Sequence, residues 1–92
     1  MYYIYFVICA DQTIYCGITT DLTRRIQEHN QSKKGAKYTR SRRPVKLAWY
    51  ETRATRSEAL KLEYQLKQLS REAKLTLCDR PDNPVLTQIN NE

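Results

Sequence analysis

The sequence is poor in the residues that build most metal centres and disulfide frameworks. It has one histidine and three cysteines among 92 residues, and no two cysteines form a CxxC pair. A zinc site of ordinary ligand spacing is therefore not expected. We interpret Cys9, Cys16 and Cys78 as small buried hydrophobic residues of a protein in a reducing compartment.

Long hydrophobic runs are also missing. The apolar opening, MYYIYFVICA, has no basic segment before it and stops at Asp11. It lacks the start of a signal peptide and is too short to span a membrane, so it is predicted to be a strand. A cytoplasmic location is the resulting expectation. The sequence has no internal repeat, low-complexity tract or linker, and its length is typical of one small domain.

Acidic residues are outnumbered, and the excess cations are concentrated in one segment. Lysine and arginine total 16 against 10 acidic residues, which gives a net charge of +6. The segment from Lys33 to Lys46 holds seven cations and no acid. The candidates for nucleic-acid contact are Lys33, Lys34, Lys37, Tyr38, Arg40, Arg42 and Arg43. A solvated loop is the alternative, but this concentration of charge favours DNA, or RNA, as the partner. No amphipathic basic helix accompanies it, so a membrane partner is not expected.

Three segments have the residue pattern of β-strands. Residues 2–9 and 13–18 are rich in β-branched and aromatic side chains and flank a turn at Asp11 and Gln12. Residues 45–50 alternate apolar and other side chains. They are predicted to form a third strand that pairs with the hairpin.

The register of the hairpin decides which side chains share a face. If Cys9 pairs with Thr13, Tyr5 lies opposite Gly17. Alternation then places on one face of the sheet Tyr3, Tyr5, Tyr15 and Gly17. A loop one residue longer would reverse the two faces.

Helices are predicted between and after the strands. Thr20 or Asp21 can cap a helix over residues 22–31. Thr55-Arg56-Ser57-Glu58 is a capping box that opens a second helix, which reaches about residue 69. Ser70 begins a third helix that ends near residue 78.

The predicted fold class is therefore α+β. It is a small three-stranded antiparallel sheet flanked by about three helices, with residues 31–44 as a loop. Residues 1–80 form the domain and residues 81–92 a polar tail. In that tail Val85, Leu86 and Ile89 are candidates to dock on the body.

One carboxylate falls where an apolar side chain is expected. In the second helix the apolar stripe consists of Ala59, Leu62, Leu66 and Leu69, and Glu63 lies inside or beside it. Burial of an unpaired carboxylate is unfavourable, so Glu63 needs a cation, a metal ion or a solvent-filled cleft. The alternative is a structural ion pair with an arginine, or a position at the flank of the stripe.

Arg25 and His29 raise the same question in the first helix. They are four residues apart, so their side chains share a face, and Arg25 flanks the apolar Leu22 and Ile26. The alternatives are a surface arginine whose stem covers the core and a satisfied surface histidine.

These segments, taken in order, resemble the GIY-YIG nuclease superfamily. Tyr3-Ile4-Tyr5 is similar to its first triplet and Tyr15-Cys16-Gly17 to its second, with Tyr3 and Cys16 in place of a glycine and an isoleucine. EALKLEYQLK, residues 58–67, resembles the helix that carries the family's metal-binding glutamate. AKYTRSRRPVKL, residues 36–47, is similar to the small stand-alone bacterial YazA/YhbQ-like group.

The resemblance implies a metal-dependent DNA endonuclease or nickase that acts on branched, damaged or single-stranded DNA. By resemblance, Glu63 would bind Mg²⁺ or Mn²⁺, and Tyr5 or Tyr15 would activate or orient the attacking water. Arg25 would stabilise charge on the scissile phosphate, and His29 would assist proton transfer or position a phosphate. Gly17 would leave room for a close approach at this site.

Two other functions stay open at this point. One is a non-catalytic nucleic-acid-binding module on the same scaffold. The other is a small adaptor that docks a repair or recombination protein.

Overall fold

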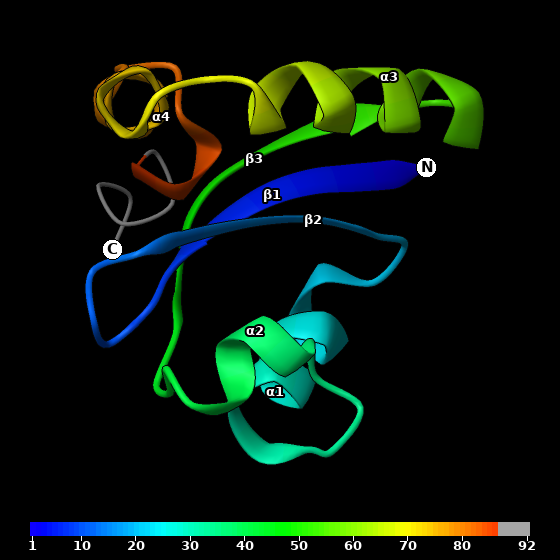
Figure 1. Ribbon diagram of the computed structural model, residues 1–92. Helices are drawn as coiled ribbons and strands as arrows, with labels where there is room; N and C mark the ends of the chain where they lie inside the picture. Colours follow the sequence, from blue (N-terminus) through cyan, green and yellow to red (C-terminus); the bar gives the residue numbers. More distant parts are fainter. Residues whose placement is uncertain (87–92) are drawn as a thin grey trace.

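The computed structural model describes residues 1–86, which form an antiparallel sheet between two helical layers (Figure 1). The strands are β1 (Tyr2–Ile8), β2 (Ile14–Thr19) and β3 (Lys46–Arg53), in the spatial order β2-β1-β3. The helices are α1 (Leu22–Gln31), α2 (Lys37–Arg40), α3 (Arg56–Lys67) and α4 (Arg71–Asp79). Figure 1 shows α3 and α4 on one side of the sheet and α1 and α2 on the other. The predicted α+β class and three-stranded antiparallel sheet are confirmed.

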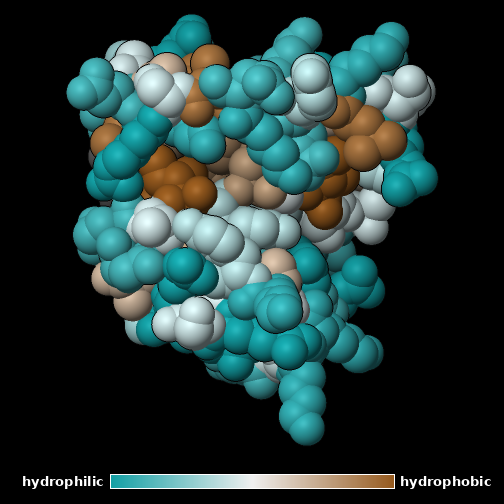
Figure 2. Space-filling model, viewed as in Figure 1, coloured by the Kyte–Doolittle hydropathy of each residue, from teal (hydrophilic) through white to brown (hydrophobic). Residues whose placement is uncertain are grey.

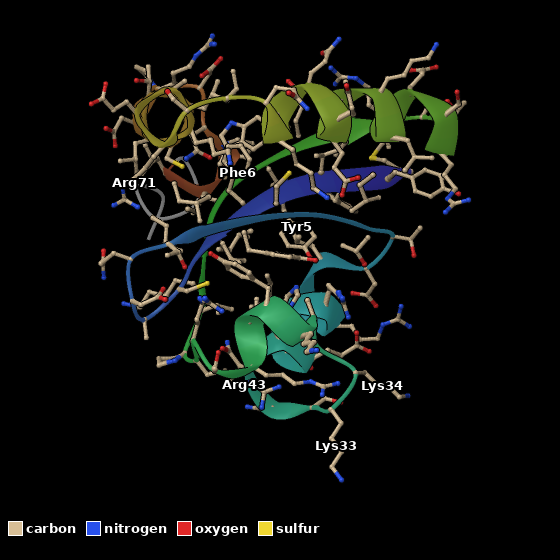
Figure 3. The ribbon with its side chains drawn as sticks, in the orientation of Figure 1. Tyr5, Phe6, Lys33, Lys34, Arg43 and Arg71 are labelled. Atoms are coloured by element: carbon tan, nitrogen blue, oxygen red, sulfur yellow. The ribbon has the colours of Figure 1, made fainter. Side chains whose placement is uncertain are left out.

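The hairpin has the predicted register. The backbone N–H of Cys9 donates to the carbonyl of Thr13 at 2.9 Å, and Tyr5 lies opposite Gly17. Figure 3 shows Tyr5 on the side of α1 and its neighbour Phe6 on the side of α3 and α4. The alternation of β1 therefore separates two cores.

Each face of the sheet has its own hydrophobic cluster. Under α3 and α4 the buried members are Ile4, Phe6, Cys16, Trp49, Ala59, Leu66 and Cys78. On the other face they are Tyr5, Val7, Cys9 and Val45, with Leu22 and Ile26 of α1 packed against them. All three cysteines are buried and free, as predicted.

The helices begin where the capping residues predict. Asp21 accepts a hydrogen bond from the backbone N–H of Arg24, and Thr55 accepts one from Glu58. Ser70 caps α4 in the same way. These side chains satisfy backbone donors that have no partner within the helix.

The loop predicted over residues 31–44 contains one helical turn, α2, so the prediction is wrong there. A single turn is too short to show a periodic pattern, and side-chain hydrogen bonds to nearby carbonyls hold this one. The Thr39 hydroxyl donates to the carbonyl of Ala36 at 2.8 Å, and Arg42 donates to the carbonyl of Tyr38 at 2.8 Å. Gly35 permits the close approach, because a Cβ there would lie 2.5 Å from the carbonyl oxygen of Glu28.

The chain after α4 packs on the body as far as the structure describes it. Asn83 is buried, and its amide donates to the carbonyls of Ala48 and Cys78 at 2.7 and 2.8 Å. Val85 and Leu86 line a cavity of about 500 Å³. Ile89, the third predicted docking residue, lies outside the described residues. No helix formed by residues 1–86 has the length and apolar character needed to cross a bilayer.

Candidate active site

A cleft of about 330 Å³ opens along the outer strand β2, between the two helical layers. It is lined by Tyr2, Tyr5, Tyr15, Gly17, Ile18, Thr19, Thr20, Arg25, Arg56, Leu60 and Glu63. Tyr5, Tyr15, Arg25 and Glu63 thus meet in one open cleft although they come from β1, β2, α1 and α3. Figure 2 shows this side of the molecule, where a pale band of intermediate hydropathy separates the two hydrophilic helical layers.

His29 is buried beneath this cleft and binds Tyr5. Its Nε2 lies 2.7 Å from the Tyr5 hydroxyl, and its Nδ1 lies 3.0 Å from Oγ1 of Thr39. Because the Thr39 hydroxyl donates its proton to the carbonyl of Ala36, its oxygen is left to accept from Nδ1–H. The backbone N–H of Ala36 also approaches Nδ1, at 3.4 Å, but the shorter contact with Thr39 assigns the proton of neutral His29 to Nδ1 and leaves Nε2 to accept from Tyr5.

Burial sets the protonation of this pair. It raises the pKa of Tyr5 well above that of an ordinary phenol, against the opposing effect of the Arg25 guanidinium. Burial, followed by repulsion from the Arg25 cation, lowers the pKa of His29 to about 4. Near neutral pH the pair is therefore an uncharged phenol that donates to an uncharged imidazole.

The depressed pKa of His29 predicts a loss of stability in mild acid. The unfolded chain binds a proton at this residue below about pH 6.5, whereas the folded chain binds it only below about 4. The free energy of unfolding should therefore be highest above pH 6.5 and fall by on the order of 3 kcal/mol as the pH drops to 4. Urea unfolding at a series of pH values measures this dependence.

A His29→Gln variant is the control for that measurement. The variant should be less stable than the parent near neutral pH. Its free energy of unfolding should change much less with pH between about 5 and 6.5, where ordinary carboxylates stay ionised. An unchanged slope in this variant would assign the acid sensitivity to another group.

Arg25 is held from two directions at the edge of the cleft. One guanidinium nitrogen donates to the Glu28 carboxylate at 3.1 Å and to the carbonyl of Lys34 at 2.8 Å. Its side chain is 24% exposed. The group is thus fixed in orientation, and it links the cleft to the basic segment that follows α1.

Tyr15 is supported by a stack of side chains. Its ring lies 5.8 Å from that of Tyr38 at an interplanar angle of 26°, and the guanidinium of Arg42 lies 4.0 Å from the Tyr38 ring centroid. Arg42 in turn forms an ion pair of 3.0 Å with Asp11 in the hairpin turn. Tyr38, a sequence candidate for nucleic-acid contact, therefore already stacks on Tyr15.

The side chain of Glu63 lines the cleft and also pairs with a cation. Its side chain is 19% exposed, and its carboxylate lies 3.5 Å from the ammonium group of Lys67. The partner is a lysine one turn later in α3, not the arginine considered as an alternative. Residues 1–86 contain no cluster of three potential metal ligands among histidine, cysteine and acidic side chains. A single carboxylate facing an open cleft suits Mg²⁺ or Mn²⁺, which keeps several waters and takes further ligands from substrate phosphates.

The basic segment divides into arginines that build the fold and lysines that project from it. Arg40 donates to the carbonyl of Lys33, and Arg43 donates to the carbonyls of His29 and Ser32 at the end of α1. The ammonium groups of Lys33, Lys34 and Lys37 have no carboxylate partner within residues 1–86. Figure 3 shows Lys33 and Lys34 extending outward and away from the sheet.

Sequence reasoning did not identify two cleft residues of α3. Arg56 and Leu60 line the cleft together with Glu63. The three positions follow the helical spacing i, i+4 and i+7, so extending the face of Glu63 toward the start of its helix would have found them.

The chain is similar to known proteins in sequence. Residues 1–76 match the family model described as the GIY-YIG catalytic domain. The UPF0213 protein DP2720 of Desulfotalea psychrophila is 60% identical over 76 residues, which cover 83% of this chain and 69% of that protein. A UPF0213 protein of Lactiplantibacillus plantarum is 55% identical over 83 residues, covering 88% and 81%.

Solved structures show the same likeness. The UPF0213 protein BH0048 of Bacillus halodurans is 42% identical with a TM-score of 0.56, and the match covers 92% of this chain and 90% of that one. The protein EF2693 of E. faecalis is 40% identical with a TM-score of 0.58, covering 99% and 88%.

Proposed function

The chain belongs to the GIY-YIG catalytic-domain family, and from that membership we propose that it is a metal-dependent DNA endonuclease or nickase. The observation that carries the proposal is the convergence of Tyr5, Arg25 and Glu63 on one open cleft. Hydrolysis of a phosphodiester requires an activated water, a counter-charge for the phosphate oxygens and stabilisation of the leaving group. The first two needs have candidates among the residues that line the cleft, and a metal ion held by Glu63 would serve the third.

Arg25 supplies the counter-charge. A guanidinium always carries its charge at neutral pH and can bind two phosphate oxygens at once. Because Glu28 and the Lys34 carbonyl hold Arg25, little reorganisation is needed when negative charge develops on the phosphate.

Tyr5 orients the attacking water, and His29 holds the Tyr5 hydroxyl in place. The hydroxyl of Tyr5 donates to Nε2 of His29, so its oxygen is fixed where it can accept a hydrogen bond from water. His29 acts through Tyr5 here, because its buried ring does not line the cleft. Tyr15, held by Tyr38, bounds the cleft from β2 and positions the substrate.

Glu63 would hold Mg²⁺ or Mn²⁺ through its carboxylate. When bound, such an ion supplies Lewis acidity at a phosphate oxygen and lowers the pKa of a coordinated water. Lys67, which pairs with Glu63, would be released toward the phosphate backbone.

A cleavage panel tests the proposal. Purified protein is incubated with labelled single-stranded, branched and linear duplex DNA in Mg²⁺, in Mn²⁺ and in chelator. We expect cutting of at least one unpaired or branched substrate that requires the metal. Metal-dependent cutting no greater than that of a Glu63→Gln preparation would reject the nuclease.

The division of the basic segment predicts which cations contact the substrate. Replacing Lys33, Lys34 and Lys37 by alanine should weaken DNA binding and reduce the salt slope of log K by about 2 to 3, with little change in melting temperature. Arg43→Ala should lower the melting temperature, because it leaves carbonyls at the end of α1 without donors. Binding titrations at several salt concentrations, with thermal unfolding in parallel, separate the two effects. A triple lysine variant with unaltered salt dependence would place the phosphate contacts elsewhere.

A non-catalytic nucleic-acid-binding module is the second candidate. The Glu63–Lys67 ion pair favours it, since the carboxylate has a partner without any metal. It predicts salt-sensitive binding that survives Glu63→Gln together with no cutting under any metal condition.

A further inference from the structure

The exposed face of α3 carries two large apolar side chains beside the cleft. Leu60 is 43% exposed and lines the cleft, and Tyr64 is 68% exposed. They are four residues apart, so they are neighbours on the helix surface. Within residues 1–86 the other large apolar side chains with high exposure are Met1 and Tyr38.

These side chains continue the cleft outward. Arg56, Leu60 and Glu63 form the α3 wall of the cleft, and Tyr64 follows Leu60 on the side turned away from the buried Ala59 and Leu66. Figure 2 shows apolar surface on this side of the molecule, between α3 and the sheet. A ligand that occupies the cleft beside Glu63 can therefore extend directly onto Leu60 and Tyr64.

Cations stand at both ends of this face. Arg56 precedes Leu60 by one turn, and Lys67 follows Glu63 by one turn with a side chain that is 53% exposed. A phenol and an aliphatic side chain between two cations match an alternation of flat bases and phosphates. A purely apolar protein partner would offer no anion to Arg56, for which no ion pair is formed among the described residues.

The bases of an intact duplex do not present their faces, because each is stacked between its neighbours. An exposed tyrosine can stack only on a base that is unpaired or has left the stack. Tyr38 already stacks on Tyr15 and contacts the guanidinium of Arg42. Tyr64 is therefore the exposed ring beside the cleft that has no ring partner among the described residues.

We propose that Leu60 and Tyr64 form a platform for an unpaired nucleobase next to the phosphate bound in the cleft. The proposal rests on the proposed function and narrows its substrate class to nucleic acid with unpaired nucleotides. Tyr64 contributes the stacking surface, Leu60 fills the space between the stacked base and the cleft, and Arg56 binds a neighbouring phosphate.

Binding in chelator tests the platform without any cleavage. The probes are a fluorescein-labelled single strand, a forked duplex and a blunt duplex of related sequence, measured by anisotropy. Tyr64→Ala should weaken binding of the single strand and the fork at least about fivefold, the lower end of the effect of a lost base–aromatic stack. Blunt duplex binding should change by less than about twofold, because phosphate contacts dominate it.

Two variants control for structure and chemistry. Tyr64→Phe keeps the ring and should retain the affinity of the parent. Gln65→Ala changes an exposed residue on another side of the same helix and should have no effect. In the parent, a fluorescent adenine analogue in the unpaired arm should be quenched on binding, and Tyr64→Ala should remove that quenching.

The outcomes separate this inference from the nuclease proposal. Equal weakening for all three probes, or none for any, overturns the platform and leaves the exposed face to another partner. Selective binding that depends on Tyr64, without cutting in any metal, supports the platform and rejects the nuclease. Cutting that is indifferent to Tyr64→Ala supports the nuclease and rejects the platform.

Discussion

Replacing Glu63 by glutamine is expected to reduce metal-dependent cleavage at least about a hundredfold while leaving the fold intact. Among the described residues that line the cleft, Glu63 is the only acidic one, so a divalent cation there has no second carboxylate to use. Glutamine keeps the shape and removes the charge. The ion pair with Lys67 is lost, but a pair at this surface position contributes only about 0–1 kcal/mol.

Initial cleavage rates across a range of Mn²⁺ concentrations measure this effect. Calorimetric titration of the protein with Mn²⁺ provides a second readout that does not need substrate. Glu72→Gln is the matched control, because Glu72 is an exposed acid on the neighbouring helix α4 and lies outside the cleft. If the Glu63 variant cuts as fast as the Glu72 variant, the cleft is not the catalytic centre.

The strands and most helix boundaries could be predicted because their determinants are local. Side-chain alternation and a turn of fixed length set the register of Tyr5 against Gly17. Asp21, Thr55 and Ser70 each mark a helix start through a bond to a backbone N–H three residues later. None of these features depends on distant parts of the chain.

The candidate site could be predicted only in part. The stripe of α3 indicated that Glu63 needs a partner, and the i,i+4 spacing offers Lys67 on the same helix, but the meeting of Glu63 with Arg25 of α1 in one cleft does not follow from one helix. The resemblance named the cleft residues that the structure brings together. It did not indicate that His29 would be fully buried and would reach the solvent-facing chemistry only through Tyr5.

The basic segment shows why composition does not predict roles. Each arginine and each lysine adds one positive charge, yet the arginines bind backbone carbonyls that α1 and α2 bring into reach. A guanidinium has five donors in a fixed plane and suits this task, whereas the ammonium of lysine is strongly hydrated and stays at the surface. The difference appears only once the two short helices are placed together.

Gly17→Ala is expected to inactivate the site, because the added methyl group would displace Tyr5. Gly17 is not required by its backbone angle, since no described glycine has a positive φ. It is required for space, because a Cβ would lie 2.5 Å from the Tyr5 hydroxyl oxygen and 2.7 Å from the ring carbon that bears it. The room that was predicted for a close approach at the phosphate site is taken up by Tyr5. Tyr5 is 1% exposed and bound to His29, so its ring cannot move aside without breaking that hydrogen bond.

The expected result is a loss of about 1–3 kcal/mol in the free energy of unfolding and a fall in cleavage rate of about a hundredfold. A double-mutant cycle with Tyr5→Phe identifies the cause. Removal of the hydroxyl takes away the closer of the two clashes and frees the ring from His29 so that it can shift, so the double variant should be more stable than the sum of the two single changes predicts. Its activity should stay low, because the group that orients the water is gone. If the two changes are additive in stability and Gly17→Ala cuts normally, Tyr5 is not held where the chemistry needs it, and the neighbouring Tyr15 becomes the better candidate for orienting the water.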